Sequence, residues 1–122
     1  MKRLMWLLAP ALLVLVASAL PAVRASAQQP VVTDDNLEQM IANAKTPADH
    51  EAIAAFYDKE AADAEAKAKL HHAVEKNYES FHMKPSDMIN HCHQEAKYFK
   101  DAADQAKAMA ADHRKMAQEA GK

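Results

Sequence analysis

The sequence predicts an all-α protein, a long antiparallel two-helix hairpin preceded by a short N-terminal helix. Residues 50–74 and 92–116 read as one helical segment written twice, at an offset of 42 positions. Helix-breaking residues are scarce, because Pro85 and Gly121 are the only proline and glycine after residue 47. Apolar residues recur in both segments at alternating steps of four and three, which indicates the heptad seam of packed helices.

The first 27 residues have the pattern of a secretory signal peptide. Lys2 and Arg3 form a positive start, residues 5–19 are mostly apolar, and residues 25–27 are small. The apolar run is shorter than the span of about 20 residues that crosses a bilayer. We therefore expect cleavage after Ala27 and a periplasmic or secreted protein with no membrane attachment.

The mature segment, residues 28–122, is expected to form one helical domain. Cleavage removes three of the 15 positive residues and none of the 17 acidic ones, which leaves a net charge of −5. An acidic domain without a basic patch is a poor ligand for nucleic acid. Nucleic-acid binding is therefore not expected.

Each expected helix has its own start signal. The short helix should span about residues 34–45, with Thr33 as its N-cap. The second should span about residues 47–80, because Thr46 is a good N-cap and Pro47 suits the first helical position. The third should span about residues 86–120 with Ser86 as its N-cap, which leaves residues 81–85 as the turn.

The predicted seam consists mostly of alanine and therefore buries little area. Its members are His50, Ala54, Tyr57, Ala61, Ala64, Ala68 and His71 in the second helix, and Cys92, Ala96, Phe99, Ala103, Ala106, Ala110, His113 and Ala117 in the third. Further burial is expected from the short helix or from a second copy of the chain. We favour a homodimer that forms a four-helix bundle, with a monomeric three-helix bundle as the alternative. Interspersed charges are expected to form a solvated face, among them Glu65 and Lys107.

A first group of metal-ligating residues lies near the turn. If the two copies fold back on each other, His71 comes near Cys92, and Met88 shares a helix face with Cys92. Thiolate, thioether and imidazole suit Cu(I), or Zn(II) if Glu75 or Glu95 replaces the thioether. Cys92 is the only cysteine, so no intrachain disulfide can form, and its other interpretation is a small buried apolar residue. His72, His82, His91 and His93 are left open as ligands or surface residues.

A second group lies at the opposite end of the expected hairpin. Met109, His113 and Met116 follow one helix face, and His50 is expected opposite them. Two imidazoles and two thioethers again suit Cu(I) or Ag(I). The same spacing is also typical of an ordinary core stripe, in which methionine fills gaps.

Enzymatic function is not expected. The sequence has no Cys-x-x-Cys-His haem motif, no His-Glu-x-x-His, no glycine-rich phosphate loop and no Gly-x-Ser-x-Gly elbow. A two-helix hairpin also offers no concave substrate pocket. Non-covalent haem is disfavoured because helices that pack closely through alanine leave little room for a macrocycle.

Four stretches, residues 46–51, 61–64, 91–92 and 109–116, resemble a group of small, uncharacterised, alanine-rich exported proteins of Gram-negative bacteria. The resemblance implies a periplasmic helical hairpin and brings no established activity. The chain is more loosely similar to bacterial copper-storage four-helix bundles, whose cores carry many cysteines. With a single cysteine, this chain would bind few ions.

Two functions follow from the residues. The first is an exported protein that binds a soft transition metal, copper before zinc, for sequestration or delivery. The second is a periplasmic structural or interaction bundle in which histidine and methionine only pack or face solvent.

Overall fold

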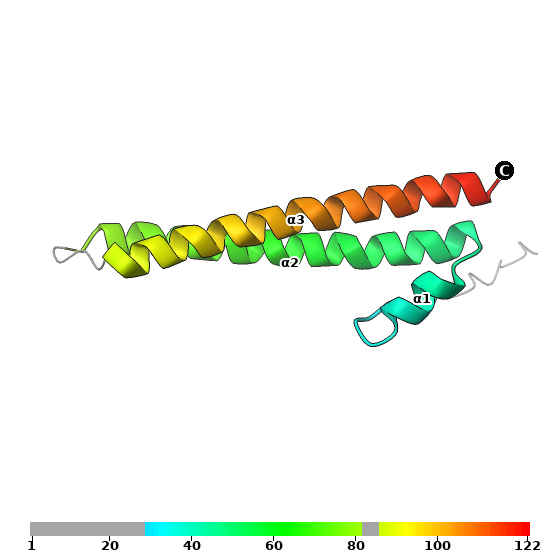
Figure 1. Cartoon of the computed structure of the whole chain (residues 1–122), viewed down its shortest axis with the longest axis horizontal. Coiled ribbons are helices and arrows are strands. Elements are labelled where there is room, and N and C mark those ends of the chain that lie inside the picture. The colour runs from blue at the N-terminus through cyan, green and yellow to red at the C-terminus, as the bar shows by residue number, and fades with distance from the viewer. Residues whose placement is uncertain (1–28, 82–85) are drawn as a thin grey trace, which may run out of the picture.

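The structure is a computed structural model that describes residues 29–81 and 86–122. Its elements are α1 (Leu37–Asn43), α2 (Pro47–Glu79) and α3 (Ser86–Ala120), and no strand occurs in the described ranges. α2 and α3 lie side by side and antiparallel, and α1 packs near the start of α2 (Figure 1). The predicted all-α hairpin is thus confirmed. The signal segment and residues 82–85 of the expected turn lie outside the described residues.

The two ends of the hairpin have different surroundings. We call the end where α2 begins and α3 finishes the open end, and the other the turn end (Figure 1). α2 has 33 residues and α3 has 35, so each is about 50 Å long at 1.5 Å per residue. In the described part of the chain, no helix is both long and apolar enough to cross a bilayer.

The start of α2 follows the predicted capping pattern. The Thr46 hydroxyl accepts a hydrogen bond from the Asp49 N–H at 3.2 Å, and the Asp49 carboxylate accepts one from the Thr46 N–H at 2.9 Å. Asp49 also accepts the Lys45 N–H at 3.0 Å. These backbone hydrogen bonds, from Lys45 first, lower the pKa of Asp49. Together with Pro47 at the first turn, the reciprocal bonds satisfy amides that a helix start would leave unpaired.

The short helix begins later than predicted. The sequence suggested a start near residue 34 with Thr33 as the N-cap, but α1 begins at Leu37 and ends at Asn43. The Asn36 side chain accepts the Thr33 N–H at 2.8 Å and donates to the Val31 carbonyl at 3.0 Å. These local bonds hold residues 34–36 in a turn, so the helix starts only after Asn36.

The heptad seam is confirmed over most of the interface. On α3 the buried residues follow it closely: Cys92, Ala103, Ala106, Ala110, His113 and Ala117. On α2 Ala54, Tyr57 and Ala61 are buried in the seam, while His50 and His71 are partly buried. The seam also continues one step past its predicted end, because Glu75 is buried at the next position.

The largest side-chain burial is at the open end. Ile53 is fully buried and forms a cluster with Ala54, Tyr57 and Ala110. Five partly buried residues pack against this cluster, two of them from α1: Val32, Leu37, Met40, Ala44 and Phe56. Burial of one isoleucine contributes about 2–3 kcal/mol. α1 therefore supplies a third layer where the alanine seam alone buries little.

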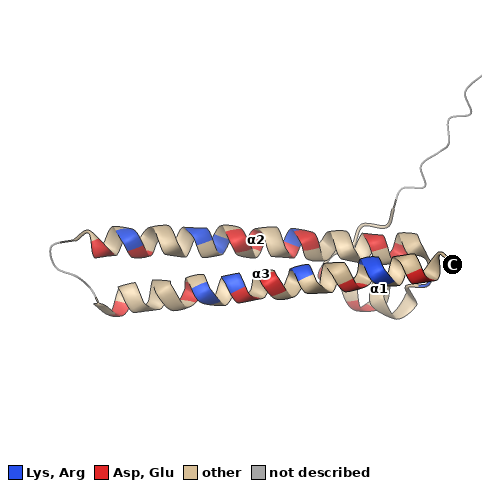
Figure 2. Ribbon diagram, turned by 90° about the horizontal axis from the view of Figure 1, so that it is seen from above, with Lys and Arg blue, Asp and Glu red and all other residues tan. Residues whose placement is uncertain are grey.

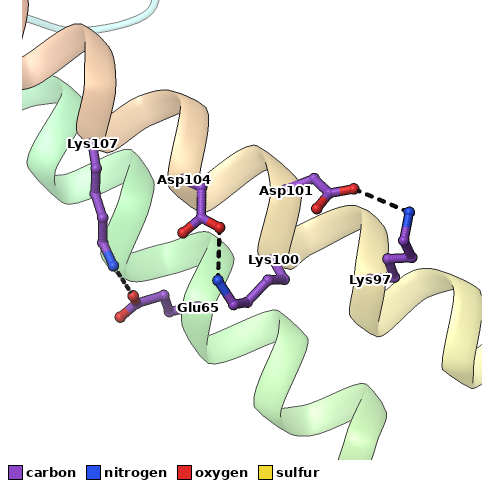
Figure 3. A network of polar contacts seen from close by, with 6 residues as sticks. All are labelled: Glu65, Lys97, Lys100, Asp101, Asp104 and Lys107. Atoms are coloured by element: carbon purple, nitrogen blue, oxygen red, sulfur yellow. Dashed lines mark hydrogen bonds and ion pairs between the residues drawn. The ribbon is translucent and has the colours of Figure 1, made fainter.

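Ion pairs connect α2 and α3 along one side of the hairpin, which we call the ion-pair flank. Glu65 pairs with Lys107, and Asp58 with Arg114, which also lies 3.8 Å from Glu51. The predicted solvated face is therefore partly cross-linked. Figure 2 shows charges of both signs along both long helices. Figure 3 shows the Glu65–Lys107 pair beside two pairs within α3, Lys100–Asp104 and Lys97–Asp101.

Candidate metal centre

His50 and His113 meet across the open end of the hairpin. Their Nδ1 atoms lie 3.3 Å apart although the residues are 63 positions apart in the chain. The ring centroids are 5.6 Å apart with a 36° angle between the planes. The predicted juxtaposition of these two residues is therefore present in the structure.

The surroundings of His113 favour a neutral, well-oriented imidazole. Its exposed fraction is 9%, and the Tyr57 ring stacks on it at a centroid distance of 5.9 Å. Burial, followed by the nearby His50, lowers the pKa of His113. A neutral imidazole keeps a lone pair that can accept a proton or bind a metal ion.

The distance between the two nitrogens is compatible with either a shared proton or a shared metal ion. At 3.3 Å one Nδ1–H can donate to the other Nδ1. With metal–nitrogen bonds of about 2.0 Å, the same separation corresponds to an angle of about 110° at the ion, which is close to tetrahedral. An ion held this way would need one or two further donors.

Two thioethers flank His113 on its helix. Met109 lies one turn before His113 and Met116 about one turn after it, and both side chains are 44% exposed. Met109 also lines a shallow hollow with Phe56, Tyr57 and Leu37 of α1. Both methionines are thus free to reorient, but neither is held against the histidine pair by a buried contact.

At the turn end, the predicted ligands are His71, Met88 and Cys92. The His71 ring stacks on Phe99, with centroids 5.5 Å apart and a 22° interplanar angle. Cys92 is a buried free cysteine, and Met88 is 43% exposed near the start of α3. The His71 ring is therefore packed on an aromatic neighbour, and a ligand role for these three residues stays a prediction.

Glu75 is a buried polar residue of the turn end. From the sequence it was expected only as a possible Zn(II) ligand in place of the Met88 thioether. Its carboxylate lies 3.1 Å from Nδ1 of His72 and 3.1 Å from Nδ1 of His93, so it links α2 to α3. The hydrogen bond with His72, and then that with His93, lowers the pKa of Glu75. The signal was present in the sequence, because Glu75 continues the four-and-three spacing four residues after His71.

The remaining histidines do not join these groups. His91 is exposed on α3, whereas His82 lies outside the described residues. Across residues 29–81 and 86–122, no three histidine, cysteine or acidic side chains form a group that could hold a metal ion. The histidine pair would therefore need a thioether or an external donor to complete a coordination shell.

Comparison of the chain with known protein families, curated proteins and solved structures finds no match in any of the three.

Proposed function

We propose that this is an exported helical protein that binds one soft metal ion, Cu(I) before Zn(II), between His50 and His113. Its role would be sequestration or delivery of the ion, without turnover. The observation that carries the proposal is the 3.3 Å separation of the two Nδ1 atoms at a partly buried position. Two donors that are far apart in the sequence thus converge on two packed helices. The signal-like pattern of the first 27 residues supports export.

The donor chemistry supports copper over zinc at this end. Zinc sites in proteins are typically completed by thiolate, imidazole or carboxylate, whereas Cu(I) also accepts thioethers. Met109 and Met116 are the nearest such donors along α3. His71, Met88 and Cys92 form a second proposed site, in which the His71 ring stacks on Phe99.

Competition against a Cu(I) chelator tests the proposal directly. Protein spanning residues 28–122 would be titrated anaerobically, and the His113→Gln and His50→Gln variants compared with the unaltered sequence. Each substitution should weaken binding by roughly tenfold or more, equivalent to about 1.4 kcal/mol. Met109→Leu and Met116→Leu conserve side-chain volume and identify the thioether that completes the site. Circular dichroism of each variant checks that the helices remain folded.

Cys92→Ser separates the two proposed sites. Weaker binding in Cys92→Ser with unchanged binding in His113→Gln would move the site to the turn end and overturn the open-end assignment. Weak binding that none of these substitutions changes would remove the metal proposal altogether. His91→Gln is the matched control, because His91 is exposed and belongs to neither site.

The second candidate function is a periplasmic structural or interaction module that binds no metal. It is favoured by the stacking of His71 on Phe99 and of His113 on Tyr57, since both histidines then act as packing residues. In that function the histidine pair shares a proton instead of a metal ion. Unchanged nitrogen chemical shifts of His50 and His113 on addition of Cu(I) or Ag(I) would support this candidate.

A further inference from the structure

A second side of the hairpin carries large apolar side chains among charged ones and is only partly covered. On α2, Phe56 and Leu70 are 14 residues apart and therefore share one face, and on α3 Ala102 and Met109 are seven apart. Phe56 and Met109 line one hollow between the helices, and Ala102 and Tyr98 line the next. We call this side the apolar flank; its residues are Ile53, Phe56, Leu70 and Val74 of α2 and Met88, Tyr98, Ala102 and Met109 of α3.

The chain already binds a helix to this flank at the open end. Leu37 and Met40 of α1 pack against the cluster that contains Ile53. α1 and Asp34, in the turn before it, line the flank from the open end to about Asp63, which is about 25 Å of a hairpin that is about 50 Å long. Beyond this point the described residues leave the flank largely uncovered, since Leu70 is 60% exposed and Tyr98 is 65% exposed.

We propose that the uncovered part of the apolar flank binds the same part of a second copy of the chain, with the two hairpins antiparallel and their turn ends overlapping. This interface would continue the surface on which α1 packs, where the flank already binds one helix. A patch that binds its own copy through a two-fold axis forms a closed dimer. Lys67 and Glu95 also lie on this flank, seven residues before Val74 and Ala102, so the interface includes one charge of each sign from each copy.

The turn end buries little apolar surface within one chain, and a second copy would bury more. Its buried seam residues are Cys92 and the carboxylate Glu75, which contribute little apolar area. Two copies facing each other would bury Leu70 and Tyr98 of both chains. The ion-pair flank offers no such gain, because Glu65 and Asp58 already have partners there.

The position of α1 determines the orientation of the two copies. In a parallel pair, the two α1 helices would meet on the same face at the same end and collide. In an antiparallel pair each α1 lies outside the overlap, near the turn of the other copy. The overlap is about 25 Å long and 20 Å wide, or about 1,000 Å² buried in total, which is the lower limit for a specific interface. The dimer should therefore be reversible.

Sedimentation equilibrium of metal-free protein spanning residues 28–122 tests the interface. We expect a monomer–dimer equilibrium that Leu70→Glu and Tyr98→Glu each shift to monomer, by roughly tenfold or more in the dissociation constant. Ala62→Glu is the matched control, because Ala62 is exposed on the opposite side of α2. Unchanged helix content by circular dichroism shows that the variants are folded. Because no metal is present, failure of this inference is distinct from failure of the copper proposal.

Spin labels test the orientation. With Cys92→Ser as background, labels at Gln118→Cys should lie about 70 Å apart in the antiparallel dimer and labels at Glu79→Cys about 25–30 Å apart. A short distance for both pairs would indicate a parallel dimer and overturn the proposed arrangement. A chain that stays monomeric at millimolar concentration, a dimer that survives both glutamate substitutions, or association that continues beyond two copies would overturn the interface.

Discussion

The open end and the turn end of the hairpin share one seam pattern but differ in their third layer. At the open end, α1 covers Ile53, and His113 is buried against His50 and Tyr57. At the turn end no helix of the described residues covers Leu70, and the buried residues of the seam there are Glu75 and Cys92. The heptad pattern therefore determines which residues of α2 and α3 face each other. The covering layer determines how much those contacts stabilise the fold.

The duplicated segment makes the same point with two equivalent residues. His71 and His113 occupy the same position in the two copies. His113 is buried and meets a second imidazole, while His71 is partly exposed and stacks on Phe99. Equivalent sequence therefore leads to different chemistry, because each copy faces different residues on the other helix.

The largest expected effect is from Ile53→Ala. Loss of a fully buried isoleucine should lower the free energy of unfolding by about 2–5 kcal/mol, because the surrounding residues cannot fill the cavity. Urea denaturation followed by circular dichroism measures the change. Leu70→Ala is the matched control. It should lower the free energy of unfolding far less in dilute protein, because the Leu70 side chain is exposed in the monomer. Equal losses in the two variants would contradict the difference between the ends.

Removal of the cap of α2 should have the next largest effect. Thr46→Ala deletes the hydroxyl that accepts the Asp49 N–H, at a cost of about 1 kcal/mol. Thr33→Ala tests the capping role that the sequence suggested for Thr33. The structure predicts little change there, since the hydrogen bond to Asn36 uses the Thr33 backbone N–H. A larger loss of thermal stability from Thr33→Ala than from Thr46→Ala would instead support Thr33 as the N-cap and an earlier start of the short helix.

The open end should make the protein less stable in mild acid. The pKa of His113 is lower in the folded protein than its ordinary value of 6.5, so the unfolded chain binds the proton more readily. Stability is therefore complete above about pH 6.5 and falls as the pH decreases through that value. His113→Leu should flatten this part of the pH profile in urea titrations, whereas His91→Leu should leave it unchanged. A profile that His113→Leu does not alter would assign the acid sensitivity to another group.

The smallest expected effect is that of Glu75→Gln at the turn end. His72 and His93 lower the pKa of Glu75, so its contribution is present above its ordinary value of 4.5 and lost as the pH falls through the lower folded value. Both histidines are largely exposed, and such pairs contribute little. The expected result at neutral pH is faster amide exchange in the turn-end residues of α2 and α3 alone. Faster exchange near Ile53 as well would mean that the two ends are coupled.

Much of the fold could be predicted from the sequence. The cap at Thr46 and the scarcity of proline and glycine predicted the long helices, and the four-and-three spacing predicted the buried alanines of α3. The start of α1 could not be predicted, because the side chain of Asn36 binds the Thr33 N–H and the Val31 carbonyl and so holds the residues before the helix in a turn. The pairing of His50 with His113 was anticipated, but the stack of His71 on Phe99 depends on rotamers that spacing does not determine.

The junction between α1 and α2 determines how long α1 stays packed over Ile53. Only residues 44–46 separate the two helices, and the backbone amides of Lys45 and Thr46 are both held by Asp49. A tether this short keeps α1 at an effective concentration in the millimolar range, so each detachment is followed by rapid rebinding. A single proteolytic cut in the junction would leave every contact of α1 intact. The released segment N-terminal to the cut, which carries α1 and Val32, would nevertheless diffuse away, because its interface is too small to bind without the tether.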